Sequence, residues 1–142
     1  MPDFLHDIPD NIIEEYKDYY KIAVIGSRKI TDKQMIYNNL NYLINTLLKW
    51  NKIQLNKLII VSGKAIGVDR IAMQYAIDNN LIDWNILADW DKYGKRGGML
   101  RNPNIIKHSD RIIAFQLDNS KGTQNGIDHA MKMNKKIHVI SI

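Results

Sequence analysis

Residues 89–102 read DWDKYGKRGGMLRN and combine two carboxylates, two aromatic rings, three glycines and four cations in fourteen positions. Lysine and arginine bind phosphate oxygens, aromatic rings supply flat surfaces for a base or ribose, and glycine lets a ligand approach the backbone. We therefore interpret this segment as part of a nucleotide-binding site. Its candidate ligand-binding residues are Asp89, Trp90, Lys92, Tyr93, Gly94, Lys95, Gly98, Arg101 and Asn102.

Three other polar segments that contain glycine, GSRKITD, SGKAIGVD and DNSKGTQNG, each follow a short apolar run. Glycine after a strand often only permits a turn, but the repetition of such segments after successive strands indicates a shared site. Gly26 allows close backbone approach, Ser27 offers a hydroxyl and an amide, and Arg28 offers a forked donor for phosphate. The candidate ligand-binding residues in these three segments are Gly26, Ser27, Arg28, Ser62, Gly63, Lys64, Gly67, Asp69, Ser120, Gly122 and Thr123.

Five apolar runs supply the strands that must position these segments. They lie at residues 21–26, 57–63, 84–89, 111–116 and 136–142, and segments with helical spacing lie between them at 31–50, 67–80, 98–108 and 123–134. Strands that alternate with helices predict an α/β fold of the Rossmann-like, doubly wound type, which is a three-layer sandwich around about five parallel strands. Ligands bind beyond the carboxyl ends of such strands, where the strand order reverses.

The chain has 142 residues, which is the usual size of one domain. We expect residues 1–20 to form an N-terminal helical extension, with a helix over NIIEEYKDYY outside the sheet, and residues 21–142 to form the ligand-binding domain. The sequence lacks cysteine, a basic leader and any apolar run of membrane-spanning length. We therefore expect a cytoplasmic protein without a membrane partner.

The net charge of +5 attracts phosphates, whether on a free nucleotide or on nucleic acid. Because the lysines are scattered, we expect weak, non-specific nucleic-acid binding at most. The four histidines lack the spacing of metal ligands, so we predict no metal site. Aspartates can hold a Mg²⁺ ion that bridges phosphates of a ligand, although the sequence has no ligand spacing that specifies one.

Two familiar phosphate-binding motifs are absent from the sequence. The dinucleotide fingerprint G-x-G-x-x-G would follow the first strand, where the sequence is GSRKIT. The P-loop requires Ser or Thr after its lysine, but Ala65 follows Lys64. The chain is therefore neither a standard NAD-binding domain nor a P-loop NTPase.

The order IGSR, SGKAIGVD, ADWDKYGKRGGMLRN and SKGT resembles the SLOG superfamily, and within it the small family related to YspA. The resemblance extends over about residues 21–140. It implies a Rossmann-like domain that binds nucleotides or nucleotide derivatives. The superfamily includes the Lonely Guy phosphoribohydrolases, domains that recognise ADP-ribose-type ligands, and DNA-processing protein A. Because SLOG relatives are often dimers, the resemblance also implies a homo-oligomer.

The stretch RNPNIIKHSDRIIAFQLDNSKGTQNG resembles the catalytic segment of the Lonely Guy enzymes. The resemblance places Arg101 at the catalytic arginine and Gly122 and Thr123 in the phosphate-binding turn, but it places Gly126 at the catalytic glutamate. Cleavage of the bond between base and ribose would then need an aspartate. The candidate carboxylates are Asp69 and Asp89 at strand ends, followed by Asp128. Asp69 can instead cap its helix or orient the GSR loop, so whether the protein is an enzyme stays open.

Three functional hypotheses follow from these residues. The first is a sensor or sequestering module that binds a free nucleotide or an ADP-ribose-like derivative. The second is a nucleotide N-glycosidase in which Arg101 acts with Asp69 or Asp89. The third is a single-stranded nucleic-acid binder, supported by the charge and by the resemblance of SGKAIGVD to DNA-processing protein A.

Overall fold

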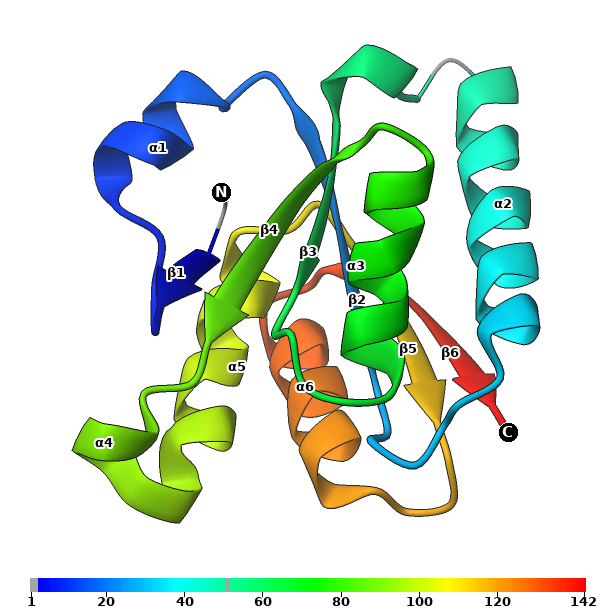
Figure 1. The fold of residues 1–142 in the computed structure, drawn as a ribbon. Coiled ribbons are helices and arrows are strands. Elements are labelled where there is room, and N and C mark those ends of the chain that lie inside the picture. The colour runs from blue at the N-terminus through cyan, green and yellow to red at the C-terminus, as the bar shows by residue number, and fades with distance from the viewer. Residues whose placement is uncertain (1–2, 51) are drawn as a thin grey trace.

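A computed structural model describes residues 3–50 and 52–142 of the chain and contains one six-stranded sheet flanked by helices (Figure 1). The strands are β1 (Asp3–Leu5), β2 (Tyr20–Gly26), β3 (Leu58–Ser62), β4 (Ile82–Leu87), β5 (Arg111–Gln116) and β6 (Lys136–Ser141). The helices are α1 (Asp10–Glu15), α2 (Lys33–Lys49), α3 (Val68–Asp78), α4 (Trp90–Tyr93), α5 (Gly97–Lys107) and α6 (Lys121–Lys132), with short 3₁₀ turns η1 (Leu55–Lys57) and η2 (Gly94–Arg96).

All neighbouring strands of the sheet are parallel, in the order β1-β4-β3-β2-β5-β6. The chain proceeds from β2 through β3 to β4 on one side, and then crosses to place β5 and β6 on the other side of β2 (Figure 1). The strand order therefore reverses between β2 and β5. The predicted Rossmann-like α/β fold is confirmed, with six strands rather than about five.

The two faces of the sheet carry separate apolar cores. In β2, Ile22 and Val24 pack with α2 and α3, whereas Ala23 and Ile25 pack with α5 and α6. Because helices cover both faces, the central strands are mostly apolar and buried, as β3 shows. This continuous burial is the physical reason why the strands could be recognised as short apolar runs.

Helix α2 lies within residues 31–50, a segment that we predicted to be helical from its apolar spacing. Its buried residues are Ile36, Leu40, Leu43, Ile44 and Leu47. The carboxylate of Asp32 accepts a hydrogen bond from the amide of Met35 at 3.1 Å and so caps the first turn. The helix ends at Lys49.

The N-terminal segment contains a strand as well as the predicted helix. Helix α1 covers only Asp10–Glu15, and β1 pairs in parallel with β4, with Asp3 opposite Asn85 and Leu5 opposite Leu87. We did not predict β1 because three residues carry no periodic signal and their partner edge exists only once β4 has formed. The division of the chain at residue 20 stays a prediction. Within the described ranges, no helix is long and apolar enough to cross a membrane.

Candidate functional site

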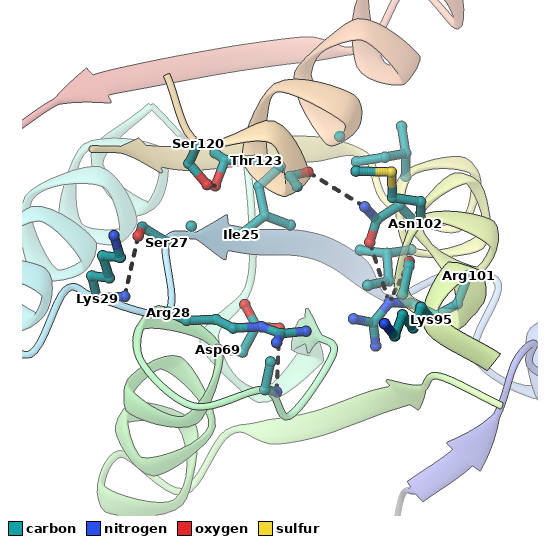
Figure 2. Close-up of a pocket in the computed structure, with 18 of the residues that line it drawn as sticks. Ile25, Ser27, Arg28, Lys29, Asp69, Lys95, Arg101, Asn102, Ser120 and Thr123 are labelled. Carbon is teal, nitrogen blue, oxygen red and sulfur yellow. Dashed lines mark hydrogen bonds between the residues drawn. The ribbon is translucent and has the colours of Figure 1, made fainter. Parts of the chain in front are cut away.

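A cavity of about 370 Å³ lies at the carboxyl ends of β2 and β5, where the strand order reverses (Figure 2). This is the position at which doubly wound sheets bind ligands. Its lining residues are Ile25, Gly26, Ser27, Arg28, Lys29, Ala65, Asp69, Trp90, Lys95, Gly98, Met99, Arg101, Asn102, Ile105, Ile106, Ser120, Gly122, Thr123 and Gly126. The segments after four different strands therefore meet at one cavity.

Arg101 of α5 brings a nearly buried guanidinium into this cavity, with only 6% of the residue exposed. Its Nη1 donates to the carbonyl oxygens of Ile86 at 2.6 Å and Gly63 at 3.1 Å. Its Nε donates to the carbonyl oxygen of Gly98 at 3.3 Å and to Oδ1 of Asn102 at 3.2 Å. Nη2 makes no hydrogen bond with the residues that the structure describes. One arm of the fork is therefore left for an anionic ligand.

Asp69, the second residue of α3, is the carboxylate next to this guanidinium, and the residue is 7% exposed. Its Oδ2 accepts hydrogen bonds from the amides of Gly63 at 3.2 Å and Ala65 at 3.4 Å. Burial raises the pKa of the Asp69 carboxyl to about 6, although Arg101 and these two amides act to lower it. A Cβ atom on Gly63 would lie 2.6 Å from Cζ of Arg101 and 2.8 Å from Oδ2 of Asp69. The two charged groups thus come together over a position that only glycine fits.

Trp90 forms an aromatic wall of the cavity. The backbone of Gly97 and Gly98 lies against the indole, because a Cβ atom at these positions would be 3.2 Å from Cε3 and 3.3 Å from Cη2 of the ring. Cζ of Arg28 lies 5.9 Å from the ring centroid, within the range of a cation–π contact. Trp90 remains 48% exposed. A planar group that enters the cavity can therefore stack on the indole in place of Arg28.

The start of α6 provides hydroxyls and amides on the side of the cavity opposite Arg28 and Asp69 (Figure 2). Oγ of Ser120 lies 3.3 Å from Oγ1 of Thr123, and the first amides of a helix have no acceptors within the helix. Nδ2 of Asn102 donates to the carbonyl oxygen of Gly122 at 3.4 Å and to Oδ1 of Asn125 at 3.2 Å. Asn102 therefore holds α5 against α6 and keeps both cavity walls together.

Most of the residues predicted to bind a ligand line this cavity. They are Gly26, Ser27, Arg28, Asp69, Trp90, Lys95, Gly98, Arg101, Asn102, Ser120, Gly122 and Thr123. The others lie outside the lining. They are Ser62, Gly63, Lys64, Gly67, Asp89, Lys92, Tyr93 and Gly94.

Several of the side chains outside the lining have other partners. The ammonium of Lys64 pairs with the carboxylate of Asp3 at 2.7 Å, on the side of the β3–α3 loop that faces β1. Oδ1 of Asp89 accepts a hydrogen bond from the amide of Lys92 at 3.0 Å and caps α4. Nζ of Lys92 lies 5.2 Å from the ring centroid of Tyr93. These four side chains therefore make their contacts outside the cavity lining.

The remaining positions outside the lining shape the backbone or lie behind the cavity. Gly67 and Gly94 have φ values of 86° and 59°, a region that L side chains rarely adopt. Ser62 is buried in β3. Oδ1 of Asp128 accepts a hydrogen bond from Gln124 on the same helix at 2.9 Å. Of the three candidate carboxylates, Asp69 is the one that lines the cavity.

The structure adds lining residues that we did not predict, namely Ile25, Lys29, Ala65, Met99, Ile105, Ile106 and Gly126. Lys29 directly follows the GSR segment, so it could have been predicted from its position in the sequence. Ile105 lies one helical turn after Arg101 and could have been found from helix spacing. Among the residues that the structure describes, no three His, Asp or Glu side chains converge in a way that could hold a metal ion.

The fold and the cavity together define a Rossmann-like α/β domain with a cavity where its strand order reverses. Residues 20–93, slightly more than half of the chain, match the model of the YspA, cpYpsA-related SLOG family. The chain belongs to this family. The predicted resemblance to SLOG proteins is thereby confirmed.

Three known proteins show the extent of this similarity. The Gene 61 protein of Mycobacterium phage D29 is 35% identical over 81 residues, which cover 53% of this chain and 65% of the phage protein. DNA processing protein A from Helicobacter pylori, whose structure describes a single-stranded DNA binding mode, shows 24% identity and a TM-score of 0.64; the match covers 88% of this chain and 67% of that chain.

DNA processing protein A from Streptococcus pneumoniae shows 18% identity and a TM-score of 0.53, and the match covers 87% of this chain and 60% of that chain. At these identities the two structures support the fold. The chain spans about two thirds or less of the length of these relatives.

Proposed function

We propose that the cavity binds the phosphorylated part of a free nucleotide or of a nucleotide derivative such as ADP-ribose, and that the protein senses or sequesters this ligand. The observation that carries the proposal is Arg101. Its guanidinium is nearly buried, is oriented by three carbonyl oxygens and one amide oxygen, and keeps Nη2 without a hydrogen bond to the described residues. A buried charge held in this way can pair with an anion at little further cost in conformational entropy.

The surroundings of Arg101 supply the other parts of a phosphate site. Arg28, Lys29 and Lys95 bring further positive charge to the lining, and the hydroxyls of Ser120 and Thr123 face the same space. A helix start also favours negative charge through its first amides. A phosphate between these groups and Arg101 would therefore meet donors from several sides.

The size and the aromatic wall of the cavity favour one compact nucleotide. Sites for small molecules have volumes of about 300 to 1,000 Å³, and this cavity lies within that range. The indole of Trp90 offers a stacking surface for the base, and Ile105, Ile106 and Met99 add apolar contacts. Phosphate and base can therefore be held at the same time.

The position of Gly126 favours binding over turnover. A Cβ atom there would lie 2.6 Å from Cδ1 of Ile25, so a larger side chain needs Ile25 to move. Asp69 is the carboxylate in the lining, and its Oδ2 already accepts two backbone amides. An N-glycosidase that uses Asp69 is the alternative proposal, because Oδ1 of this carboxylate has no hydrogen bond with the described residues.

Single-stranded nucleic acid is the second candidate ligand. It is favoured by the basic lining residues and by the structural likeness to a protein with a described single-stranded DNA binding mode. A strand bound through several phosphates would lose affinity steeply with salt, with a slope of about 0.7 per neutralised phosphate on a log–log plot. Binding that survives about 0.2 M salt and competes with nucleotide would favour this ligand over the free nucleotide.

The test is calorimetric titration with nucleoside mono- and diphosphates, ADP-ribose and a short oligothymidylate. We expect Lys95→Ala to weaken nucleotide binding by about 1.5 to 3 kcal/mol, the usual contribution of a charge-assisted hydrogen bond. Lys92→Ala is the matched control, because it removes the same charge three residues away and outside the lining. Equal losses in both variants, or no ligand binding below about a millimolar, would contradict the proposal.

Release of free base, followed by chromatography in the same samples, tests the alternative enzyme function. We expect none from a nucleotide that binds. Rapid release that is lost in Asp69→Asn would instead identify an N-glycosidase.

A further inference from the structure

The N-terminal strand β1 lies outside the family match at residues 20–93, yet it contacts the segment that forms one wall of the cavity. Oδ2 of Asp3 accepts a hydrogen bond from Nζ of Lys64 at 2.7 Å, and Oδ1 of Asp3 accepts one from Nδ2 of Asn85 at 3.0 Å. One carboxylate thus holds both the β3–α3 loop and the neighbouring strand β4.

Asn85 links Asp3 to polar groups in the interior of the protein. Nδ2 of Asn85 donates to both Asp3 and Asp83, so Oδ1 is turned toward Ser62, whose Oγ lies 3.2 Å away. Asn85 and Ser62 are 0% and 1% exposed, and Oγ of Ser62 also lies 3.4 Å from the carbonyl oxygen of Asp69. Polar contacts therefore run from Asp3 through Asn85 and Ser62 to the first turn of α3, where Asp69 lines the cavity.

The contact with Lys64 acts on the same loop. Lys64 has a φ of 59°, a left-handed conformation that is unfavourable for an L residue. Its two neighbours, Gly63 and Ala65, donate their amides to Oδ2 of Asp69, and the carbonyl oxygen of Gly63 accepts from Nη1 of Arg101. The conformation of this one loop therefore sets the geometry of both buried charges.

We propose that Asp3 is a positioning residue for the ligand site: through Lys64 and through Asn85 and Ser62 it holds the β3–α3 loop in the conformation that aligns Asp69 and Arg101. The effect on affinity rests on the proposed function. The effect on the loop does not, because it exists in the protein without ligand. Strand β1 is thereby a functional part of the site and more than an added edge of the sheet.

The first test measures the loop in the ligand-free protein by hydrogen exchange. Asp3→Asn removes the charge that pairs with Lys64 but keeps the size of the side chain. We expect the amides of Gly63 and Ala65 to exchange about tenfold faster, as for loss of one charge-assisted hydrogen bond. Asp10→Asn is the matched control, because Asp10 is exposed in the first turn of α1, and it should leave these amides unchanged. Unchanged exchange in Asp3→Asn would overturn the proposal.

The second test uses ADP-ribose as the probe. At a temperature where both proteins are folded, we expect Asp3→Asn to weaken its binding about tenfold, and Asp3→Glu to restore most of the affinity by keeping the charge. Faster exchange with unchanged affinity would overturn the positioning role in binding. If the wild-type protein binds no ADP-ribose, the proposed ligand is wrong for this probe, and the exchange rates alone decide whether Asp3 holds the loop.

Discussion

Replacement of Asp69 by asparagine should change how the stability of the protein depends on pH. Burial is the largest influence on this carboxyl and raises its pKa from 3.8 to about 6. Each pKa unit corresponds to about 1.4 kcal/mol, so ionisation of Asp69 in the folded protein lowers the free energy of unfolding by about 3 kcal/mol. Asparagine has nearly the same size and does not ionise, so Asp69→Asn removes this dependence.

The sign of the effect follows from proton binding. Because the pKa of Asp69 is higher in the folded protein, the folded form binds more protons between pH 3.8 and about 6 than the unfolded form does. The stabilising contribution of protonated Asp69 is fully present below the pKa of the unfolded protein, and it is lost as the pH rises through about 6. Between about pH 4.5 and about pH 8, the free energy of unfolding of the wild type should fall by about 2 kcal/mol relative to that of Asp69→Asn.

Urea unfolding at several pH values measures this difference, with the fluorescence of the buried Trp84 among the signals. The wild type and the variant are compared at each pH, so that carboxyls with lowered pKa values, such as those of Asp3 and Asp7, contribute equally to both. A constant difference between the two proteins would refute the raised pKa. A difference of the opposite sign would show that the attraction of Arg101 outweighs the burial of Asp69.

Three further predictions concern the packing and the walls of the cavity. Gly63→Ala should lower the free energy of unfolding by about 1 to 3 kcal/mol, because the added Cβ would meet the guanidinium of Arg101. Gly122→Ala is the control and should have little effect, because no heavy atom lies within 4 Å of its added Cβ. Equal urea midpoints for the two variants would contradict this prediction. Arg101→Met should lower the free energy of unfolding by about 3 to 5 kcal/mol, because Arg101 is buried. Arg28→Ala should change the free energy of unfolding by no more than about 0.5 kcal/mol, because Arg28 is exposed. Trp90→Ala should weaken the binding of a nucleotide in calorimetry and leave inorganic phosphate unaffected; equal losses for both ligands would argue against base stacking.

The sequence was sufficient to predict the α/β fold and the edge of the sheet at which the cavity lies, because both depend on local patterns. Strands covered on both faces must be mostly apolar, as β3 is, and helices covered on one face must carry apolar residues at helical spacing, as α2 does. Parallel strands bring all their carboxyl ends to one edge, so polar segments after the strands must gather there. These rules involve residues that are near one another in the chain.

The tertiary structure was needed wherever a partner lies far away in the chain. Lys92 and Lys95 have the same chemistry, but the turn at Gly94, with its φ of 59°, places Lys95 in the cavity and Lys92 over the ring of Tyr93. Lys64 faces away from the cavity because Asp3 pairs with it across 61 positions of sequence.

The environments of Arg101 and Asp69 likewise depend on the approach of α5 to the β3–α3 loop at Gly63, where no side chain fits. Burial, which raises the pKa of Asp69, is a property of packing and appears only when these distant segments meet. The sequence alone therefore determined which residue types gather at the sheet edge, and the tertiary structure decided which of them line the cavity and which hold the others in place.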